Sequence, residues 1–313
     1  MKEKATYRKK QRRNCSIRFL WLMLPLVLAG CEKDIDIKLA PNEPLVVVEG
    51  YINNVYPQYN YVVLSRSQSF FAPDVQGIPL SLANVTITRG QRQATGNIVW
   101  DPATRVRLIE SDNSGLPSGF NTGVYLDPRI FTRPDSALLG KIGFEYLLEI
   151  EAEGRNYSAT TSLITPVQVD SINIGYPFVN DLGDSLYRIT NNYRDPDTLG
   201  NRQFYFWRYS DNKNNFGWGG FTRSRAPGID DLANGQYIRL THPQGFSVND
   251  TITYMMASVT REVYYFWDSY NKARDNNGPF STPVTLEGTV TGSNVTGCFS
   301  GLALSVKQKV IER

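Results

Sequence analysis

Apolar and polar residues alternate with a period of two along most of the chain. The clearest example is residues 144–163, where the alternation runs on both sides of a turn signal at residues 153–156. Because successive side chains of a β-strand point to opposite faces, this stretch predicts a β-hairpin. Shorter runs rich in β-branched and aromatic residues predict further strands at residues 44–52, 61–64 and 83–88.

The predicted strands divide the chain into two β-rich modules. About seven or eight short strands, separated by clusters of Gly, Pro and Asn, fall within residues 44–166, which is typical of an immunoglobulin-like or transthyretin-like β-sandwich. Thr165-Pro166-Val167 marks the end of this sandwich. Residues 167–313 form the second module, which is richer in aromatic residues and in which strands are expected near residues 169–174, 185–190, 202–209, 236–241 and 251–259.

One segment, residues 261–274, has the period of a helix. Its apolar residues recur at intervals of three and four, which places on one face Val263, Phe266, Trp267, Tyr270 and Ala273. Thr260 is suited to cap the N-terminus, and Lys272 and Arg274 suit the C-terminal end of the helix dipole. We expect an amphipathic helix whose aromatic stripe packs on the second sheet rather than binding a ligand.

The first residues form a targeting signal. A basic segment is followed by an apolar run over residues 19–29, which is too short to span a bilayer because a spanning helix needs ~20 apolar residues. The run ends in Leu28-Ala29-Gly30-Cys31, the pattern of a lipoprotein signal. Residues 1–30 are therefore predicted to be removed, Cys31 to be acylated and to anchor the protein in a membrane, and residues 31–43 to form a tether.

Removal of the signal changes the charge of the protein. Residues 1–30 contain eight Lys and Arg against one acidic residue, so the formal net charge of +3 becomes −4 once they are removed. The basic character of the chain therefore belongs to its signal. No basic surface is expected on the mature protein, which excludes nucleic acid as a partner.

Few side chains are suited to metal binding or nucleophilic catalysis. Beyond the signal and Cys31, the chain has one thiol, Cys298, expected to be a small buried apolar residue, and one imidazole, His242. Zinc needs three or four nitrogen or sulfur ligands, and no nucleophile motif accompanies the histidine, so we predict no metal, no cofactor and no enzyme activity. Residues 195–200 resemble the opening of a calcium loop, but their Pro, Asp and Gly residues favour a simple turn.

Aromatic residues are concentrated at residues 204–221. On a strand, Phe204 and Phe206 face one side and Tyr205, Trp207 and Tyr209 face the other, and more rings follow beside glycines. One aromatic face is expected to be partly exposed, which makes a candidate contact surface of Tyr205, Trp207, Tyr209, Phe216, Trp218 and Phe221. The alternative is that both faces are packed between a sheet and a helix.

Several segments resemble a family of uncharacterised Bacteroidetes lipoproteins, which are known only as a domain of unknown function. The resemblance covers nearly the whole mature chain and rests on the lipoprotein signal with residues 32–37 and on residues 45–52, 65–71, 83–87 and 278–281. It implies a TonB-dependent outer-membrane receptor as a partner. It implies no catalytic residues.

Two further patterns are similar to signals of exported proteins in these bacteria. Lys33, Asp34 and Asp36 follow the lipidated cysteine as in an acidic surface-export tag. Five Asp-Ser or Asp-Thr pairs precede an aliphatic residue and resemble an O-glycosylation sequence, with candidate acceptors Ser136, Ser171, Ser185, Thr198 and Thr251. These patterns predict surface display and glycan modification.

The sequence therefore predicts a lipid-anchored, surface-exposed outer-membrane lipoprotein. Its expected role is that of a non-catalytic binding or accessory component of a TonB-dependent uptake system, with a glycan or peptide ligand. Two alternatives stay open, a carbohydrate-active hydrolase that uses paired carboxylates and a structural or assembly lipoprotein. Two or three carboxylates in a cleft would favour the hydrolase, and a flat apolar patch would favour partner binding.

Overall fold

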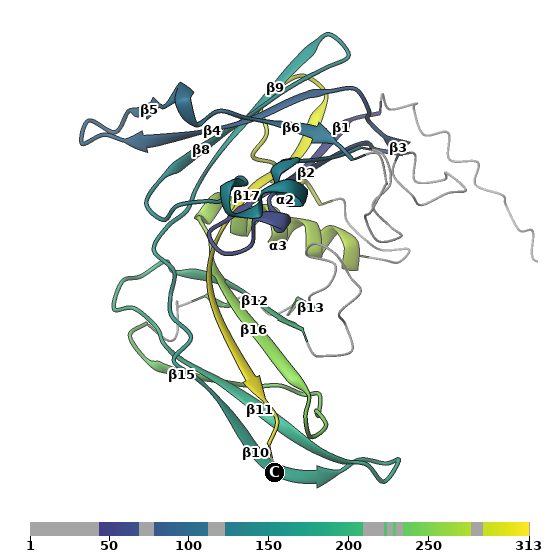
Figure 1. Ribbon diagram of the computed structural model, residues 1–313, viewed down its shortest axis with the longest axis vertical. Helices are drawn as coiled ribbons and strands as arrows, with labels where there is room; N and C mark the ends of the chain where they lie inside the picture. Colours follow the sequence, from purple (N-terminus) through teal and green to yellow (C-terminus); the bar gives the residue numbers. More distant parts are fainter. Residues whose placement is uncertain are drawn as a thin grey trace, which may run out of the picture. The chain divides into compact units, whose positions relative to one another are not determined.

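The computed structural model describes residues 44–68, 78–111, 123–208, 222–223, 228–229, 234–276 and 284–312. Strands dominate these residues (Figure 1), which confirms the predicted mostly β class. In the N-terminal half the strands are β1 (Val46–Asn53), β2 (Tyr61–Arg66), β3 (Ile78–Pro79), β4 (Asn84–Arg92), β5 (Ile98–Trp100), β6 (Val106–Glu110), β7 (Val124–Leu126), β8 (Glu145–Ala152) and β9 (Arg155–Ser162). The predicted strands and the predicted hairpin of this half are therefore confirmed.

The second half contains the remaining strands and the one long helix of the described residues. The strands are β10 (Ser171–Val179), β11 (Ser185–Arg194), β12 (Arg202–Arg208), β13 (Thr222–Arg223), β14 (Gly228–Ile229), β15 (Tyr237–Thr241), β16 (Thr251–Ser258) and β17 (Val295–Val310). The long helix is α3 (Arg261–Asp275). The shorter helical elements lie in the N-terminal half and are α2 (Arg129–Thr132) and three 3-10 turns, η1 (Pro57–Tyr59), η2 (Pro102–Thr104) and η3 (Pro134–Ser136).

One large sheet runs through both halves of the chain. Its strand order is β13-β12-β16-β17-β1-β2-β7-β6-β4-β8-β9, and β3, β5 and β14 pair beside this path. The sheet curls, because β9 contacts β17 although the two are far apart in this order. The backbone N–H of Gly301 on β17 donates to the hydroxyl of Thr161 on β9 at 2.9 Å.

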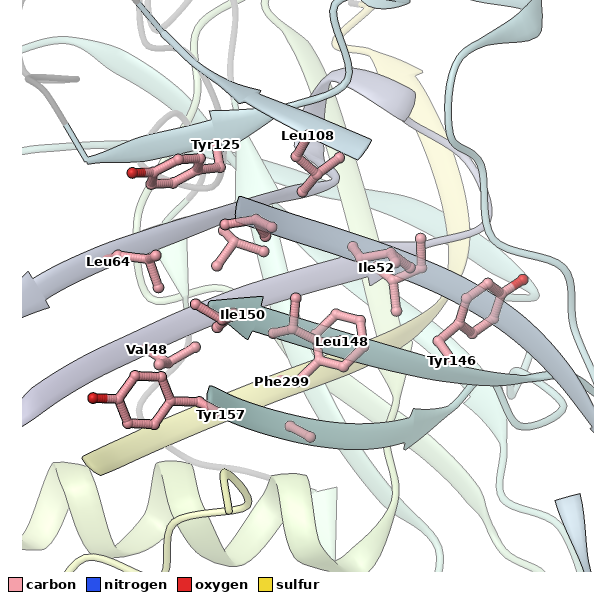
Figure 2. Close-up of a cluster of buried hydrophobic side chains, with 14 of the residues drawn as sticks. Val48, Ile52, Leu64, Leu108, Tyr125, Tyr146, Leu148, Ile150, Tyr157 and Phe299 are labelled. Carbon is pink, nitrogen blue, oxygen red and sulfur yellow. The ribbon is translucent and has the colours of Figure 1, made fainter. Parts of the chain in front are cut away.

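The curled sheet encloses the first hydrophobic core. Figure 2 shows its side chains gathered between the strands, among them Val48, Leu64, Leu148, Ile150 and Phe299. All of these side chains are almost fully buried. Full burial of an aliphatic or aromatic side chain stabilises the fold by roughly 1.5–3 kcal/mol, so this core is a main source of stability.

β17 is the central element of the fold because both of its faces are buried. Phe299 and Ala303 face the first core, and Cys298, Leu302 and Leu304 face a second core under α3. β17 also pairs in parallel with β1, from Val46 opposite Val295 to Asn53 opposite Leu302. This pairing of the start and the end of the described chain has no local signal in the sequence.

The second and third cores lie on opposite sides of β12 and β16. On β12, Phe204 and Phe206 face the second core, and Tyr205 and Trp207 face the third. The third core is covered by a separate three-stranded sheet, β10-β11-β15 (Figure 1). The predicted alternation on this strand is confirmed, and both aromatic faces have a packing partner.

Helix α3 covers the second core as predicted. Val263, Phe266 and Trp267 are buried, and the indole N–H of Trp267 donates to the hydroxyl of Ser300 at 3.0 Å. Tyr270 departs from the predicted stripe, because 39% of it is exposed. Thr260 occupies the N-cap position, but its side chain makes no capping hydrogen bond, so the predicted cap is wrong in this respect.

Residues 43–313 belong to one compact unit. The predicted boundary between residues 44–166 and 167–313 falls in the connection between β9 and β10. Because β17 pairs with β1 on one side and with β16 on the other, the two halves share a sheet, and their division into folding units stays a prediction. Across the described ranges, no helix has both the length and the apolar character needed to cross a bilayer.

Candidate functional site

A cleft of about 630 Å³ opens where the end of β9, the start of α3 and residues 287–289 meet. We call it the α3 cleft. Its residues come from the large sheet, from the helix and from the segment before β17, and they are Arg92, Glu145, Thr160, Thr161, Ser162, Thr260, Arg261, Glu262, Val263, Tyr265, Glu287, Gly288 and Thr289. Its volume is in the range of small-ligand sites.

Glu145 is a fixed, buried carboxylate of the α3 cleft. Only 7% of this residue is exposed, and one of its carboxylate oxygens accepts a hydrogen bond from Nε of Arg92 at 2.8 Å. The other oxygen accepts a hydrogen bond from the hydroxyl of Ser162. Since both oxygens already have a partner within the protein, the carboxylate of Glu145 is a structural group of the cleft.

Tyr265 is the aromatic residue of the cleft, and two arginines surround its ring. The guanidinium carbons of Arg202 and Arg261 lie 5.4 and 5.3 Å from its centroid. A guanidinium N–H of Arg202 also donates to the Tyr265 hydroxyl at 3.4 Å. This hydrogen bond, with the positive charge of Arg261, lowers the pKa of the hydroxyl below its usual value of 10.

Three carboxylates line the same cleft. Glu262 lies in the first turn of α3, and Glu287 lies on the opposite segment, where its backbone N–H donates to the hydroxyl of Ser269 at 3.1 Å. With Glu145 they set three carboxylates against the two guanidinium groups of Arg92 and Arg261. The cleft therefore contains charged groups of both signs and suits a polar ligand.

The aromatic contact surface expected from the sequence is only partly described. Tyr205 belongs to the third core, where 6% of it is exposed and its hydroxyl lies 2.7 Å from that of Tyr193. The prediction that Tyr205 forms part of a contact surface is therefore wrong, because the three-stranded sheet covers its face of β12. Trp207 is half-buried on the same face, and its ring packs edge-on against His242 at 4.5 Å between centroids. The remaining members, Tyr209, Phe216, Trp218 and Phe221, lie outside the described residues.

The histidine and the thiol of the described residues are both internal. His242 is 7% exposed, and burial lowers its pKa to about 4. Cys298 is fully buried, as the sequence predicts, and burial raises the pKa of its thiol to about 11. Neither lines the α3 cleft.

The other predicted sites fall as follows. Residues 197–200 form a turn, as predicted, and the carboxylate of Asp195 before it accepts a hydrogen bond from the Gly235 N–H at 3.3 Å. In the described part of the chain no group of three or more His, Cys, Asp and Glu residues is placed to hold a metal ion.

The predicted modification sites differ in exposure. Ser136, Ser185 and Thr198 are exposed, and Ser171 and Thr251 are half-buried. The predicted lipidation and export residues, Cys31, Lys33, Asp34 and Asp36, lie outside the described residues.

Sequence reasoning missed the α3 cleft, because its parts lie far apart along the chain. Glu145, Arg261 and Thr289 come together only when the sheet curls and α3 packs against β17. The one local signal is the run of small hydroxyl residues at 160–162, where the apolar alternation of the hairpin weakens.

Comparison with known proteins places the chain in a family. No curated protein matches its sequence. A family model described as a domain of unknown function, DUF4249, matches residues 32–308. Because this match covers most of the chain, the protein belongs to the DUF4249 family.

Proposed function

We propose that the protein is a Bacteroidetes outer-membrane lipoprotein that binds a ligand, without catalysis, as an accessory component of a TonB-dependent uptake system. The observation that carries the binding role is the α3 cleft, an open polar site of about 630 Å³. Its lining combines carboxylates, guanidinium groups and hydroxyls at the meeting point of three elements. Such a site suits recognition of a polar partner.

The membrane location is supported by the sequence before the folded body. Leu28-Ala29-Gly30-Cys31 has the lipoprotein pattern, and Lys33, Asp34 and Asp36 resemble a surface-export tag. Cys31→Ser should therefore abolish incorporation of labelled palmitate and remove the protein from the membrane fraction. Equal labelling of the wild type and the variant would contradict this location.

The chemistry of the buried groups favours binding over catalysis. The thiol of Cys298 and the imidazole of His242 lie in the interior, away from the α3 cleft, and burial shifts each pKa so that the neutral form prevails near neutral pH. Glu145 has both carboxylate oxygens engaged. The thiol and the imidazole, which are common nucleophiles and bases, are therefore out of reach of a ligand in the α3 cleft.

A receptor capture experiment tests the binding role. The tagged protein is purified from native membranes in mild detergent, and the proteins that accompany it are quantified by mass spectrometry. Thr160→Trp fills the cleft, and Thr132→Trp is the matched control at an exposed position of α2, outside the cleft. We expect a TonB-dependent receptor with the wild type and the control, and its loss with Thr160→Trp. Absence of any receptor from the wild type would refute the partnership.

The three carboxylates of the cleft favour a second candidate, a carbohydrate-active hydrolase. Because Glu145 is engaged, its acid and base would be Glu262 and Glu287. Chromogenic glycosides provide the assay. Activity that disappears in both Glu262→Gln and Glu287→Gln would establish this candidate and displace the non-catalytic one.

A further inference from the structure

β9 is the last strand of the large sheet, so one edge of β9 pairs with β8 and its other edge pairs with no strand of the described sheet order. Directly after β9, the backbone N–H of Leu163 donates to the carbonyl of Phe144 at 3.0 Å, toward the β8 side. Backbone groups of successive strand residues point in alternate directions. Thr160 and Ser162 therefore direct their N–H and C=O groups away from β8, toward the α3 cleft that they line.

The chain already pairs with this free edge at one position. The N–H of Ser158 donates to the carbonyl of Thr291 at 3.0 Å, and the N–H of Thr291 donates to the carbonyl of Ser158 at 2.7 Å. These reciprocal bonds are those of an antiparallel pair, which the two residues form as an isolated bridge. The edge of β9 is therefore able to accept another strand.

The pairing stops where the cleft begins. In a continued antiparallel ladder Thr289 would lie opposite Thr160, but its N–H donates instead to the carbonyl of Gly297 at 2.9 Å. Among the described residues, no backbone hydrogen bond to another element meets the outward N–H of Thr160 or Ser162. The carbonyl of Ser162 is approached by Gly301 of β17. Within the described part of the chain, this leaves the N–H and C=O of Thr160 and the N–H of Ser162 without a backbone partner. Unpaired groups at a strand edge are a template for a further strand.

We propose that the α3 cleft binds an extended peptide segment of a partner protein, which adds a strand to β9 at Thr160 and Ser162. This inference rests on the proposed binding function and names the chemistry of its partner. Backbone hydrogen bonds to β9 provide the affinity. The cleft selects the side chains of the segment by charge, through the positive Arg92 and Arg261 and the negative Glu262.

A peptide fits the cleft better than a glycan does. Sugar rings are commonly held against the open face of an aromatic ring, and the ring of Tyr265 lies beneath the guanidinium groups of Arg202 and Arg261. The open backbone groups of Thr160 and Ser162 are spaced two residues apart on a strand, and an extended peptide has the same spacing along its length.

A pair of substitutions at one position tests strand addition. Thr160→Pro removes the outward N–H and leaves the β8 side of the ladder intact, because proline is tolerated at edge positions whose N–H points outward. Thr160→Val is the matched control, since it keeps the N–H and the β-branched shape and removes only the hydroxyl. Circular dichroism and amide NMR spectra establish that both variants are folded.

The probe is a phage-displayed library of random dodecapeptides, selected against the full mature protein. We expect enriched peptides that bind Thr160→Pro about tenfold or more weakly than wild type, and Thr160→Val within about twofold. Bound peptide should also slow amide hydrogen exchange at Thr160 and Ser162. Failure to enrich any peptide would overturn the inference, and so would peptide binding to Thr160→Pro that equals binding to the wild type. Binding of a glycan in the cleft that does not depend on the Thr160 N–H would also overturn it.

The results separate this inference from the proposed function. Receptor capture that survives Thr160→Pro but not Thr160→Trp would keep the uptake role and overturn strand addition. Peptide binding that depends on the Thr160 N–H, in a protein that captures no receptor, would support strand addition and overturn the uptake role.

Discussion

Gly297 of β17 lies so close to Val48 of β1 that a side chain at position 297 has no space. A Cβ atom there would be 1.9 Å from the carbonyl oxygen of Val48. The φ angle of Gly297 is +132°, a conformation that L side chains rarely adopt. The parallel pairing of the two strands therefore depends on glycine at this position.

Gly297→Ala should lower the free energy of unfolding by about 3 kcal/mol or more, because both the backbone conformation and the contact are incompatible with a methyl group. The control is Gly96→Ala, at a positive φ of 88° with no atom within 4 Å of the new Cβ, which should cost only about 1 kcal/mol. Urea denaturation measures both. An equal decrease in the free energy of unfolding in the two variants would show that the close contact with Val48 does not add to the cost of the substitution.

The indole of Trp267 fixes α3 on the second core. Trp267→Phe removes the hydrogen bond to Ser300 and part of the buried ring, and should lower the free energy of unfolding by about 1–3 kcal/mol. Tyr270→Phe, on the same helix at a more exposed position, should change it by less than about 0.5 kcal/mol. A larger loss from Tyr270→Phe than from Trp267→Phe would contradict the observed packing of α3.

His242 should make the protein sensitive to mild acid. Above pH 6.5 the imidazole is neutral in both states and contributes nothing to pH dependence. Below that pH the unfolded chain takes up a proton at the usual pKa of 6.5, whereas the native state resists protonation until about pH 4. The free energy of unfolding therefore falls as the pH decreases from 6.5 to 4, by up to about 3 kcal/mol.

His242→Phe keeps an aromatic ring beside Trp207 and removes the titrating group. Its urea midpoint should fall less than that of the wild type between pH 7 and pH 4.5. Both proteins share the same carboxylates, so the difference between them isolates the imidazole. Parallel pH profiles would show that the buried histidine does not titrate as described.

The five predicted glycosylation sites should be occupied unequally. Ser136, Ser185 and Thr198 are exposed and accessible to a transferase, and Ser171 and Thr251 are half-buried in strands. Protein purified from its native host should therefore carry glycans at one or more of the three exposed sites. Intact mass and peptide mapping that show only polypeptide and lipid would reject the modification.

Local patterns predicted the elements of this fold but not their partners. The period of two located the hairpin of β8 and β9, and the helical period located α3 within one residue at its end. The parallel pairing of β1 with β17 joins residues some 250 positions apart, as Val46 opposite Val295 shows, and no local period encodes it. Alternation also placed Tyr205 and Trp207 on one face correctly, but the sheet that buries Tyr205 is formed by other strands.

Photo-crosslinking in native cells tests directly whether the α3 cleft binds a partner protein. A benzoylphenylalanine is introduced in place of Glu262 inside the cleft or of Thr132 outside it, and the irradiated membranes are analysed by mass spectrometry. We expect a single major adduct at position 262, with a TonB-dependent receptor joined through an extended segment, and none at position 132. No adduct at position 262, or the same adducts at both positions, would contradict it.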